Sequence, residues 1–523
     1  MRARSPRTPL LVTLAALALA ACSPSGAPSE GATPPPPAPS ASASAQPSER
    51  DGVATVAVDF GTATDHGFTV PKRGFVVAPT EASTPSPVVA LSHLRAPNCS
   101  DQSFHVPCPK GTTELRYDEG MRYLGERLAD EGYVAVIPDL GPVFVGEDTD
   151  DGYSQERLFE AVLADFLQGL EHDAAAGGDT FGLDLKGKVD VQRVGFLAHS
   201  RSATLVDAAR ATVGADRLKA VLTYGGAYDT YEAASMSPAP ADVPYLGVGG
   251  LADADVGLAP QQWLGHSVVR SRTTPASVVG LPGLGHMLVN RTAAKAGDDR
   301  VGCDVVECLD AAEHERVLTE VAMSWFGAWL RGAETDLPTA ATDPLPEQVA
   351  GLRARWVAAT PSAAQRFSPK DLAVEGRGAV QECVFPDPMD PSFEGTACPE
   401  PEDGVVLVPS PVAFATRATA SVEAGPAQMI ALHLAPAGTG TDEGTPVTVG
   451  LTFPAGSTTA LHVPATDEAV RNQATDVDNG TYVLGTVRLS VPEEARGKRI
   501  IRVAVSSDSG TPVVLRGLDL VGE

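Results

Sequence analysis

Residues 192–203 read QRVGFLAHSRSA, and this stretch decides the fold. An apolar run typical of a β-strand stops at Ser200, with the small residues Ala198 and Ser202 two positions to either side. The general pattern Gly-x-Ser-x-Gly places a nucleophilic serine on a sharp strand-to-helix turn, where bulky neighbours would collide with the adjacent strand and helix. Taken alone, the stretch also fits a second interpretation, in which Ser200 is the N-cap of a helix over 203–209.

Length and charge narrow the class of protein. The chain has 523 residues, of which 43% are hydrophobic, and this is enough for two ordinary domains with real cores. Its formal net charge of −27 repels phosphate backbones and anionic lipid. Nucleic acid is therefore not a predicted partner, and membrane association would need a separate anchor.

The N-terminus has the features of such an anchor. Arg2, Arg4 and Arg7 precede an apolar run over 10–21, which is too short for an ordinary membrane-spanning helix and is typical of a secretory signal. The run ends in Leu-Ala-Ala-Cys at 19–22, which resembles the bacterial lipobox. The resemblance implies that 1–22 is a lipoprotein signal peptide, that Cys22 becomes lipidated, and that the protein is exported and lipid-anchored to the cell envelope.

The residues that follow predict a tether and a disulfide-bonded body. Residues 23–50 are mostly Ser, Pro, Ala and Gly, a composition that cannot bury a core. Apart from Cys22, six cysteines form sequence-local pairs, and pairing by proximity is the simplest of the 15 possible connectivities. No pair has Cys-x-x-Cys spacing or a companion His cluster, so metal ligation is the less favoured alternative and no cofactor is predicted. The predicted pairs are Cys99–Cys108, Cys303–Cys308 and Cys383–Cys398.

Two domains with different patterns of apolar and polar residues follow the tether. Residues 51–335 alternate short apolar runs with longer amphipathic ones, which predicts a mostly parallel sheet with helices on both faces. Open sheets of this kind bind ligands at the carboxyl ends of their strands, where Ser200 lies. The predicted strands are 88–92, 133–137, 194–199, 220–224, 245–248 and 276–280, and the predicted helices are 119–131, 155–172, 203–211 and 313–330.

The second half is expected to be all-β. Residues 336–403 read as a connector with one helix over 347–358. From 404 to 523 the segments are short, β-branched and punctuated by turns, which predicts a β-sandwich or jelly roll. The strands expected there are 405–408, 430–434, 447–451, 482–484 and 500–505.

Candidates for a base and an acid follow Ser200 in order. A serine hydroxyl needs a base within hydrogen-bond reach, and that base needs a carboxylate to orient it. Asp253 follows the predicted strand 245–248, and His286 follows the predicted strand 276–280. Asp255 and Asp229 are alternative acids, because each also lies shortly after a strand.

In these motifs the chain resembles the α/β-hydrolase family, over about 51–335, and most closely its secreted lipase, cutinase-like and polyester hydrolase branch. The resemblance implies a triad of Ser200, Asp253 and His286. It also takes in Ser-His-Leu-Arg at 92–95, at the position of the segment that contributes an oxyanion-hole amide. The implied oxyanion donors are the amide of Arg201 and that of Leu94 or Arg95. Leu94 stands where glycine is usual, as Ala198 and Ser202 do in the serine motif.

The predicted function is therefore an extracytoplasmic serine hydrolase that cleaves a small-molecule, lipid or polymer ester through an acyl-enzyme intermediate. Two alternatives remain open at this point. One is an amidase with the same triad, and the other is a non-catalytic envelope-binding lipoprotein on a hydrolase scaffold. The first two disulfides would stiffen walls of the pocket, and the short segment 227–244, where many relatives carry a lid, predicts an open cleft.

Overall fold

The computed structural model describes a large part of the chain, with gaps. Its described residues are 42–43, 47–146, 152–177, 180–228, 237–304, 306–363, 365–383, 410–422, 425–436, 444–471 and 484–522. Cys22 and nearly all of the predicted tether lie outside these residues. No helix among the described residues is long and apolar enough to cross a membrane.

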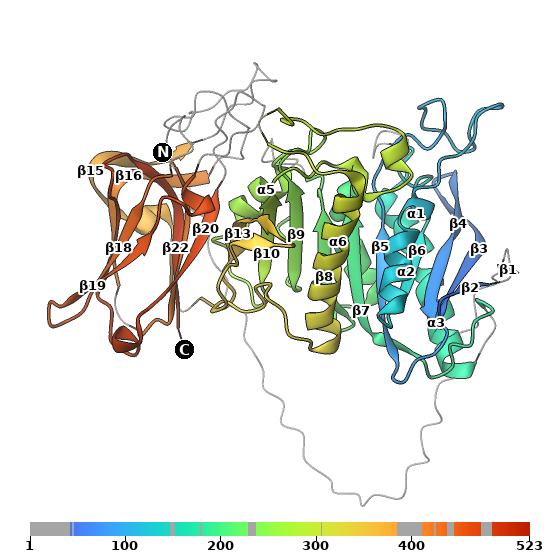
Figure 1. Ribbon diagram of the computed structural model, residues 1–523, viewed down its shortest axis with the longest axis horizontal. Coiled ribbons are helices and arrows are strands. Elements are labelled where there is room, and N and C mark those ends of the chain that lie inside the picture. The colour runs from blue at the N-terminus through green and yellow to red at the C-terminus, as the bar shows by residue number, and fades with distance from the viewer. Residues whose placement is uncertain are drawn as a thin grey trace, which may run out of the picture. The chain divides into compact units, whose positions relative to one another are not determined.

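A large, mostly parallel sheet organises the first domain (Figure 1). Its strand order is β1-β3-β4-β6-β5-β7-β8-β9-β10-β13, and β2 pairs with β3. The pairs from β6 through β10 are parallel, whereas β1 to β4 and β13 pair antiparallel. The strand bounds are Ser42–Ala43, Ser48–Arg50, Val53–Asp65, Phe68–Pro79, Ser86–Ser92, Val134–Pro138, Val189–His199, Leu218–Tyr224, Tyr245–Gly250, Ala276–Leu281 and Arg355–Ala359 for β1 to β10 and β13.

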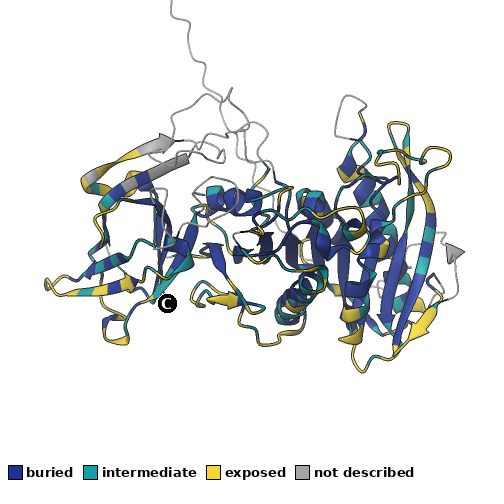
Figure 2. Cartoon of the chain, turned by 45° about the horizontal axis from the view of Figure 1, so that its top comes forward, coloured by how far each residue is buried: buried dark blue, intermediate teal, exposed yellow. Residues whose placement is uncertain are grey.

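All six strands predicted for this domain are confirmed, as β5 to β10. Their residues are almost all buried, which appears as dark blue in the centre of the domain in Figure 2. Strands covered on both faces read as continuous apolar runs rather than as alternating ones, and this is why short runs such as 88–92 were sufficient to identify them.

Helices cover both faces of the sheet. Side chains of α2 (Arg122–Asp130) and α6 (Ala311–Phe326) share one core cluster, and those of α3 (Gln155–Ala176), α4 (Val206–Val213) and α5 (Ala259–Ser267) share the other. Figure 1 shows α2 and α6 in front of the sheet. The four predicted helices are thus present, with 119–131 divided between α1 (Tyr117–Gly120) and α2.

The two longest helices begin at side-chain caps. The Ser154 hydroxyl accepts the Arg157 amide at the start of α3, and the Asp310 carboxylate accepts the Glu313 amide at the start of α6. The fully buried Trp325 near the end of α6 donates its Nε1–H to the Val221 carbonyl in β8, at 2.9 Å. Burying a large side chain contributes about 2–3 kcal/mol, so Trp325 attaches α6 firmly to the middle of β8.

The predicted helix over 347–358 is wrong. This segment forms a hairpin of β11 (Gln348–Val349) and β12 (Leu352–Arg353), followed by β13, which pairs antiparallel with β10. Ala350 and Gly351 both have positive φ, 50° and 79°, as a two-residue hairpin turn requires. The helix-favouring composition is overridden because every residue of β13 is buried against the sheet.

The C-terminal domain is all-β, as predicted. Nine antiparallel strands form a connected sheet of order β19-β18-β21-β16-β22-β17-β20, with β14 paired to β22 and β15 paired to β16. Their bounds, from β14 to β22, are Gln365–Phe367, Ala373–Cys383, Ser410–Ser421, Met429–Pro436, Val447–Thr452, Thr458–Val463, Gly485–Ser490, Arg502–Ser507 and Val513–Val521.

Three of the five strands predicted in this domain match observed ones. Strands 430–434, 447–451 and 500–505 correspond to β17, β18 and β21, although β21 begins only at Arg502. The predicted strand 405–408 and most of 482–484 lie outside the described residues. The sheet also takes in β14 and β15, which lie in the segment predicted as a connector.

A buried arginine joins the last strand of the first domain to the second domain. The guanidinium of Arg355 in β13 donates to the carbonyls of Glu468 and Arg471, at 2.6 and 2.7 Å. The Ala358 amide donates to the Thr486 hydroxyl at 2.9 Å. The connector therefore contributes strands to both sheets and a polar seam between them.

Candidate active site

Ser200 lies at the carboxyl end of β7, at a sharp turn. It is the first residue of the short 3₁₀ helix η1 (Ser200–Leu205), and its φ is 58°, in the left-handed region. A non-glycine residue held there costs on the order of 1–3 kcal/mol, which the surrounding structure must offset. The N-cap position is His199, so the interpretation of Ser200 as a helix cap is wrong.

Ser202, one of the two residues that replace glycine in the motif, connects η1 to the segment after β5. Its hydroxyl forms a short hydrogen bond with the His93 carbonyl and accepts a hydrogen bond from the Ser92 hydroxyl at 2.7 Å. All three residues are fully buried. Glycine could not make these contacts. The serine at position 202 therefore adds hydrogen bonds that link the turn at Ser200 to the segment containing Leu94.

The ring of His93 orients the peptide that follows it. Its Nε2 accepts the Leu140 amide at 2.9 Å, so the ring proton is on Nδ1, which donates to the Leu94 carbonyl at 2.9 Å. Burial lowers the pKa of His93, which keeps the ring neutral and this pattern intact. Because the C=O and N–H of a trans peptide point in opposite directions, the Arg95 amide N–H points away from the His93 ring.

Buried charges lie behind this segment. Asp139 directly follows β6, and its carboxylate forms ion pairs with the guanidinium groups of Arg73, at 2.8 Å, and Arg116, at 3.2 Å. Arg116 also pairs with Asp118. Burial, followed by the charge of Asp118, raises the pKa of Asp139 to about 6. Its Oδ1 lies 3.9 Å from Nε2 of His93, so this network adjoins the ring that orients the Leu94 peptide.

Asp253 and His286 meet at the ends of β9 and β10. Oδ2 of Asp253 lies 2.8 Å from Nδ1 of His286, and both side chains are fully buried. The other carboxylate oxygen of Asp253 accepts the amides of Asp255 and Val256, each at 2.9 Å. Three hydrogen bonds thus fix this carboxylate against the imidazole.

Main-chain contacts hold the His286 loop. The Asp299 carboxylate accepts the amides of His286 and Met287. Nε2–H of His199 donates to the His286 carbonyl at 3.1 Å, and the Tyr224 hydroxyl donates to the Gly285 carbonyl at 2.7 Å. Burial lowers the pKa of His199 well below its ordinary value, so this ring is a neutral donor.

His314 in α6 completes this support, because its Nε2 accepts the Gly285 amide at 2.8 Å.

A glycine makes room for the Asp253–His286 pair. Gly225 follows β8 with a φ of 51°, and a Cβ there would lie 2.7 Å from Nδ1 of His286 and 3.2 Å from Oδ2 of Asp253. No side chain fits this position without displacing the imidazole.

Asp255 occupies the other side of His286. Its Oδ2 lies 3.2 Å from Nε2 of His286, and its side chain is 58% exposed. The structure therefore brings Asp255 to the imidazole as well, but at the nitrogen opposite Asp253. The remaining alternative acid, Asp229, lies outside the described residues.

The predicted disulfides Cys99–Cys108 and Cys303–Cys308 are both present, with Cα–Cα distances of 5.6 and 5.1 Å. The third predicted pair cannot be placed, because Cys398 lies outside the described residues. Within the described part of the chain, no group of three or more His, Cys, Asp or Glu side chains is arranged to hold a metal ion.

A cavity of about 350 Å³ lies beside η1. Arg201 and Thr204 line it from η1, and Tyr228 and Trp263 line it with stacked rings whose centroids are 3.7 Å apart. Residues 229–236, which include much of the short segment predicted in place of a lid, lie outside the described residues.

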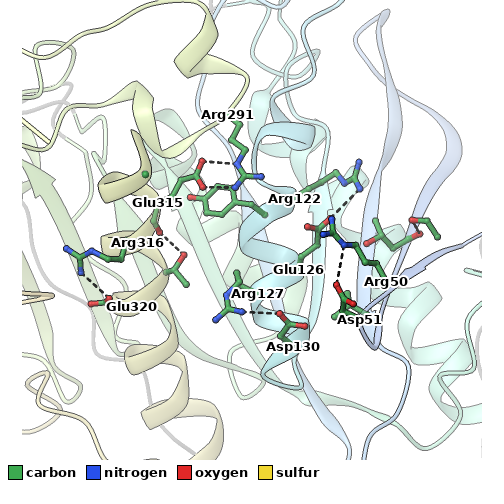
Figure 3. Close-up of a pocket in the computed structure, with 16 residues that line it drawn as sticks. Arg50, Asp51, Arg122, Glu126, Arg127, Asp130, Arg291, Glu315, Arg316 and Glu320 are labelled. Atoms are coloured by element: carbon green, nitrogen blue, oxygen red, sulfur yellow. Dashed lines mark hydrogen bonds and ion pairs between the residues drawn. The ribbon is translucent and has the colours of Figure 1, made fainter. Parts of the chain in front are cut away.

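A larger surface cleft, of about 780 Å³, does not include Ser200, Asp253 or His286 (Figure 3). It is lined by α2, α6 and residues 48–55. Each arginine labelled in Figure 3 pairs with a neighbouring carboxylate, so the charges of this cleft neutralise one another; the pairs are Arg50–Asp51, Arg122–Glu126, Arg127–Asp130, Arg291–Glu315 and Arg316–Glu320.

The first domain has an α/β-hydrolase fold, as its strand order and the turn at Ser200 show. No family model matches the chain, and no curated protein sequence does. Similar solved structures include a protein described as a dienelactone hydrolase from Klebsiella pneumoniae subsp. pneumoniae, 19% identical over 52% of this chain and 99% of its own, with a TM-score of 0.31. Another is a ferulic acid esterase from Streptomyces cinnamoneus, 15% identical over 55% of this chain and 87% of its own, with a TM-score of 0.34.

Sequence reasoning missed several residues that shape the site. Asp299, Gly225 and the bridging role of Ser202 were not predicted. A Gly-Gly pair directly after a predicted strand, at 225–226, was a usable signal for close approach of backbone to a site. The Asp299 carboxylate accepts hydrogen bonds from backbone amides, and no pattern in the sequence predicts such a contact.

Proposed function

We propose that the protein is a serine hydrolase that cleaves carboxylic esters through an acyl-enzyme intermediate. In this proposal the Ser200 hydroxyl attacks the ester carbonyl, and Nε2 of His286 takes its proton and returns it to the leaving alcohol. Asp253 orients the ring through Nδ1 and stabilises the imidazolium. The backbone amides of Arg201 and of Leu94 or Arg95 are the proposed donors to the oxyanion.

One observation carries this proposal. A fully buried carboxylate–imidazole pair, with Asp253 on Nδ1, emerges from strands β9 and β10 of the same sheet edge where Ser200 is held at a strained, positive φ. A serine in an ordinary scaffold position does not need that strain. A buried aspartate facing a histidine likewise has a direct use in proton transfer.

The proposal is tested by labelling with a fluorophosphonate probe and by turnover of p-nitrophenyl esters of graded chain length. Wild-type protein should be labelled and should hydrolyse at least one ester, whereas Ser200→Ala should do neither. Thermal unfolding of the variant should stay close to wild type, which would show that the loss is chemical. Labelling of Ser200→Ala would rule out Ser200 as the nucleophile.

An amidase is the second candidate, since the same groups can cleave an amide when the leaving amine is protonated. Matched ester and anilide substrates with one acyl group separate the two activities. A protein that is not labelled and cleaves neither substrate would instead favour the non-catalytic, envelope-binding alternative.

The site of action belongs to the same proposal. We infer that the chain is exported and held to the cell envelope by lipid on Cys22, because the N-terminal sequence has a basic head, a short apolar run and Leu-Ala-Ala-Cys. Buried acyl chains contribute about 0.8 kcal/mol per methylene, so two or more chains would anchor the protein firmly. Cys22→Ser should release active protein from the membrane fraction; retention after a high-salt wash would contradict the lipid anchor.

A further inference from the structure

Asp255 contacts the nitrogen of His286 that the proposed reaction uses. Its Oδ2 lies 3.2 Å from Nε2, on the side of the ring opposite the 2.8 Å contact between Asp253 and Nδ1. Among the described residues, Nε2 has no hydrogen-bond partner. The Ser200 hydroxyl therefore does not hydrogen-bond to it, whereas the Asp255 carboxylate lies within ion-pair distance of it.

The two carboxylates on the ring differ in their freedom to move. The Asp253 side chain is fully buried and accepts two backbone amides besides its contact with His286. The Asp255 side chain is more than half exposed. Rotation about its side-chain bonds can therefore carry Asp255 into solvent, while Asp253 stays on the ring.

We propose that Asp255 is a positioning residue that holds His286 in a resting state, in which the imidazolium forms an ion pair with the Asp255 carboxylate beside Nε2. This inference rests on the proposed function, because it concerns the same base. When the contact opens, the Nε2 proton passes to solvent and leaves a neutral imidazole. The lone pair of Nε2 can then accept the Ser200 proton as the hydroxyl oxygen bonds to the ester carbonyl carbon.

The titratable groups around His286 are consistent with this state. Burial lowers the pKa of His286, but the nearby carboxylates outweigh it and raise the pKa above its ordinary value. Burial lowers the pKa of the two neighbouring histidines, so they add no positive charge. The groups that face His286 or its loop are Asp253, Asp255 and Asp299, the rings of His199 and His314, and the Tyr224 hydroxyl.

The kinetic test is the pH profile of kcat/KM. A base works only when it is neutral, so activity falls as pH drops through the pKa of His286. Removing the Asp255 charge lowers that pKa. Asp255→Asn should therefore move the acid limb to lower pH and make the variant about two- to fivefold more active than wild type at the acid end. The exposed Asp216, in the loop before β8, offers a matched control. Asp216→Asn removes the same charge elsewhere and should leave the limb in place.

A second measurement does not need turnover. In protein labelled with ¹⁵N-histidine, the His286 ring resonances can be assigned by their loss in His286→Gln. Their titration midpoint should fall in Asp255→Asn and stay unchanged in Asp216→Asn. If neither the midpoint nor the acid limb moves, the inference is overturned while the proposed function stands. A lowered midpoint in a protein that hydrolyses no ester would support the Asp255 contact and refute the proposed function instead.

Discussion

The two loops that flank Ser200 are held in different ways. The His286 loop is fixed by groups that act on its main chain, chiefly the Asp299 carboxylate and the neutral ring of His199. The Leu94 segment is fixed by the Ser202 hydroxyl and by the His93 ring, which lies next to the ion network of the buried Asp139. A substitution that loosens the first loop would displace the proposed base His286, whereas one that loosens the second would displace the backbone amides proposed to bind the oxyanion. The two halves should therefore fail in distinguishable ways.

The largest effect is expected on the histidine side, for Asp253→Asn. The amide can no longer stabilise an imidazolium at Nδ1 and favours the wrong tautomer of His286, so kcat should fall on the order of 10⁴-fold. Steady-state kinetics on the best p-nitrophenyl ester measures this loss. Asp255→Asn is the matched control, because it removes a carboxylate from the other nitrogen of the same ring. A loss in the control as large as that in Asp253→Asn would show that the acid has been assigned to the wrong residue.

Asp299→Asn should produce the next largest effect. A neutral amide holds the His286 and Met287 amides less strongly, and a small displacement of a base costs about 10- to 100-fold in kcat. The exposed neighbour Asp298 pairs with Arg300 and provides a control, since Asp298→Asn should leave kcat within about twofold. Equal kinetics of the two variants would mean that Asp299 does not position the loop.

On the other side of Ser200, Ser202→Ala should affect stability as much as rate. It leaves the His93 carbonyl without a buried donor, which costs about 1–2 kcal/mol and should lower Tm by several degrees. We expect kcat to fall only a fewfold, with KM nearly unchanged. Thr204→Ala is the control, because Thr204 lies in the same short helix but its hydroxyl donates to the Arg201 carbonyl. A Tm equal to that of wild type for Ser202→Ala would show that the Ser202 hydroxyl does not hold the Leu94 segment in place.

The smallest effect is expected in the cleft of Figure 3. Its arginine–carboxylate pairs are of the same kind as those at Asp139, but they are more exposed to solvent. Glu315→Gln removes one partner of the half-exposed Arg291, a pair worth about 0–1 kcal/mol. Activity and Tm should both stay close to wild type. A marked loss of activity would show that this cleft takes part in function.

Much of the first domain could be predicted because its central strands are buried on both faces and read as unbroken apolar runs. Ser200, Asp253 and His286 could be proposed because each follows such a strand directly. The strand β13 was missed, since Ala, Leu and Arg favour a helix and the burial that overrides them depends on distant residues. Asp299 and Ser202 were missed for a similar reason: their hydrogen bonds go to backbone groups, which no periodicity of side chains reveals.

The pairing of β13 with β10 bears on how the chain can be shortened. A protein truncated at residue 335, where the sequence places the end of the first domain, would lack β13 and present the full edge of β10 to other chains. Unpaired edges of this kind template intermolecular strand addition, so such a fragment should aggregate on expression. Keeping residues through 360 would cover that edge but leave the Arg355 guanidinium without its carbonyl acceptors. The C-terminal domain therefore supplies the hydrogen-bond acceptors for a buried arginine in the strand that covers the edge of β10.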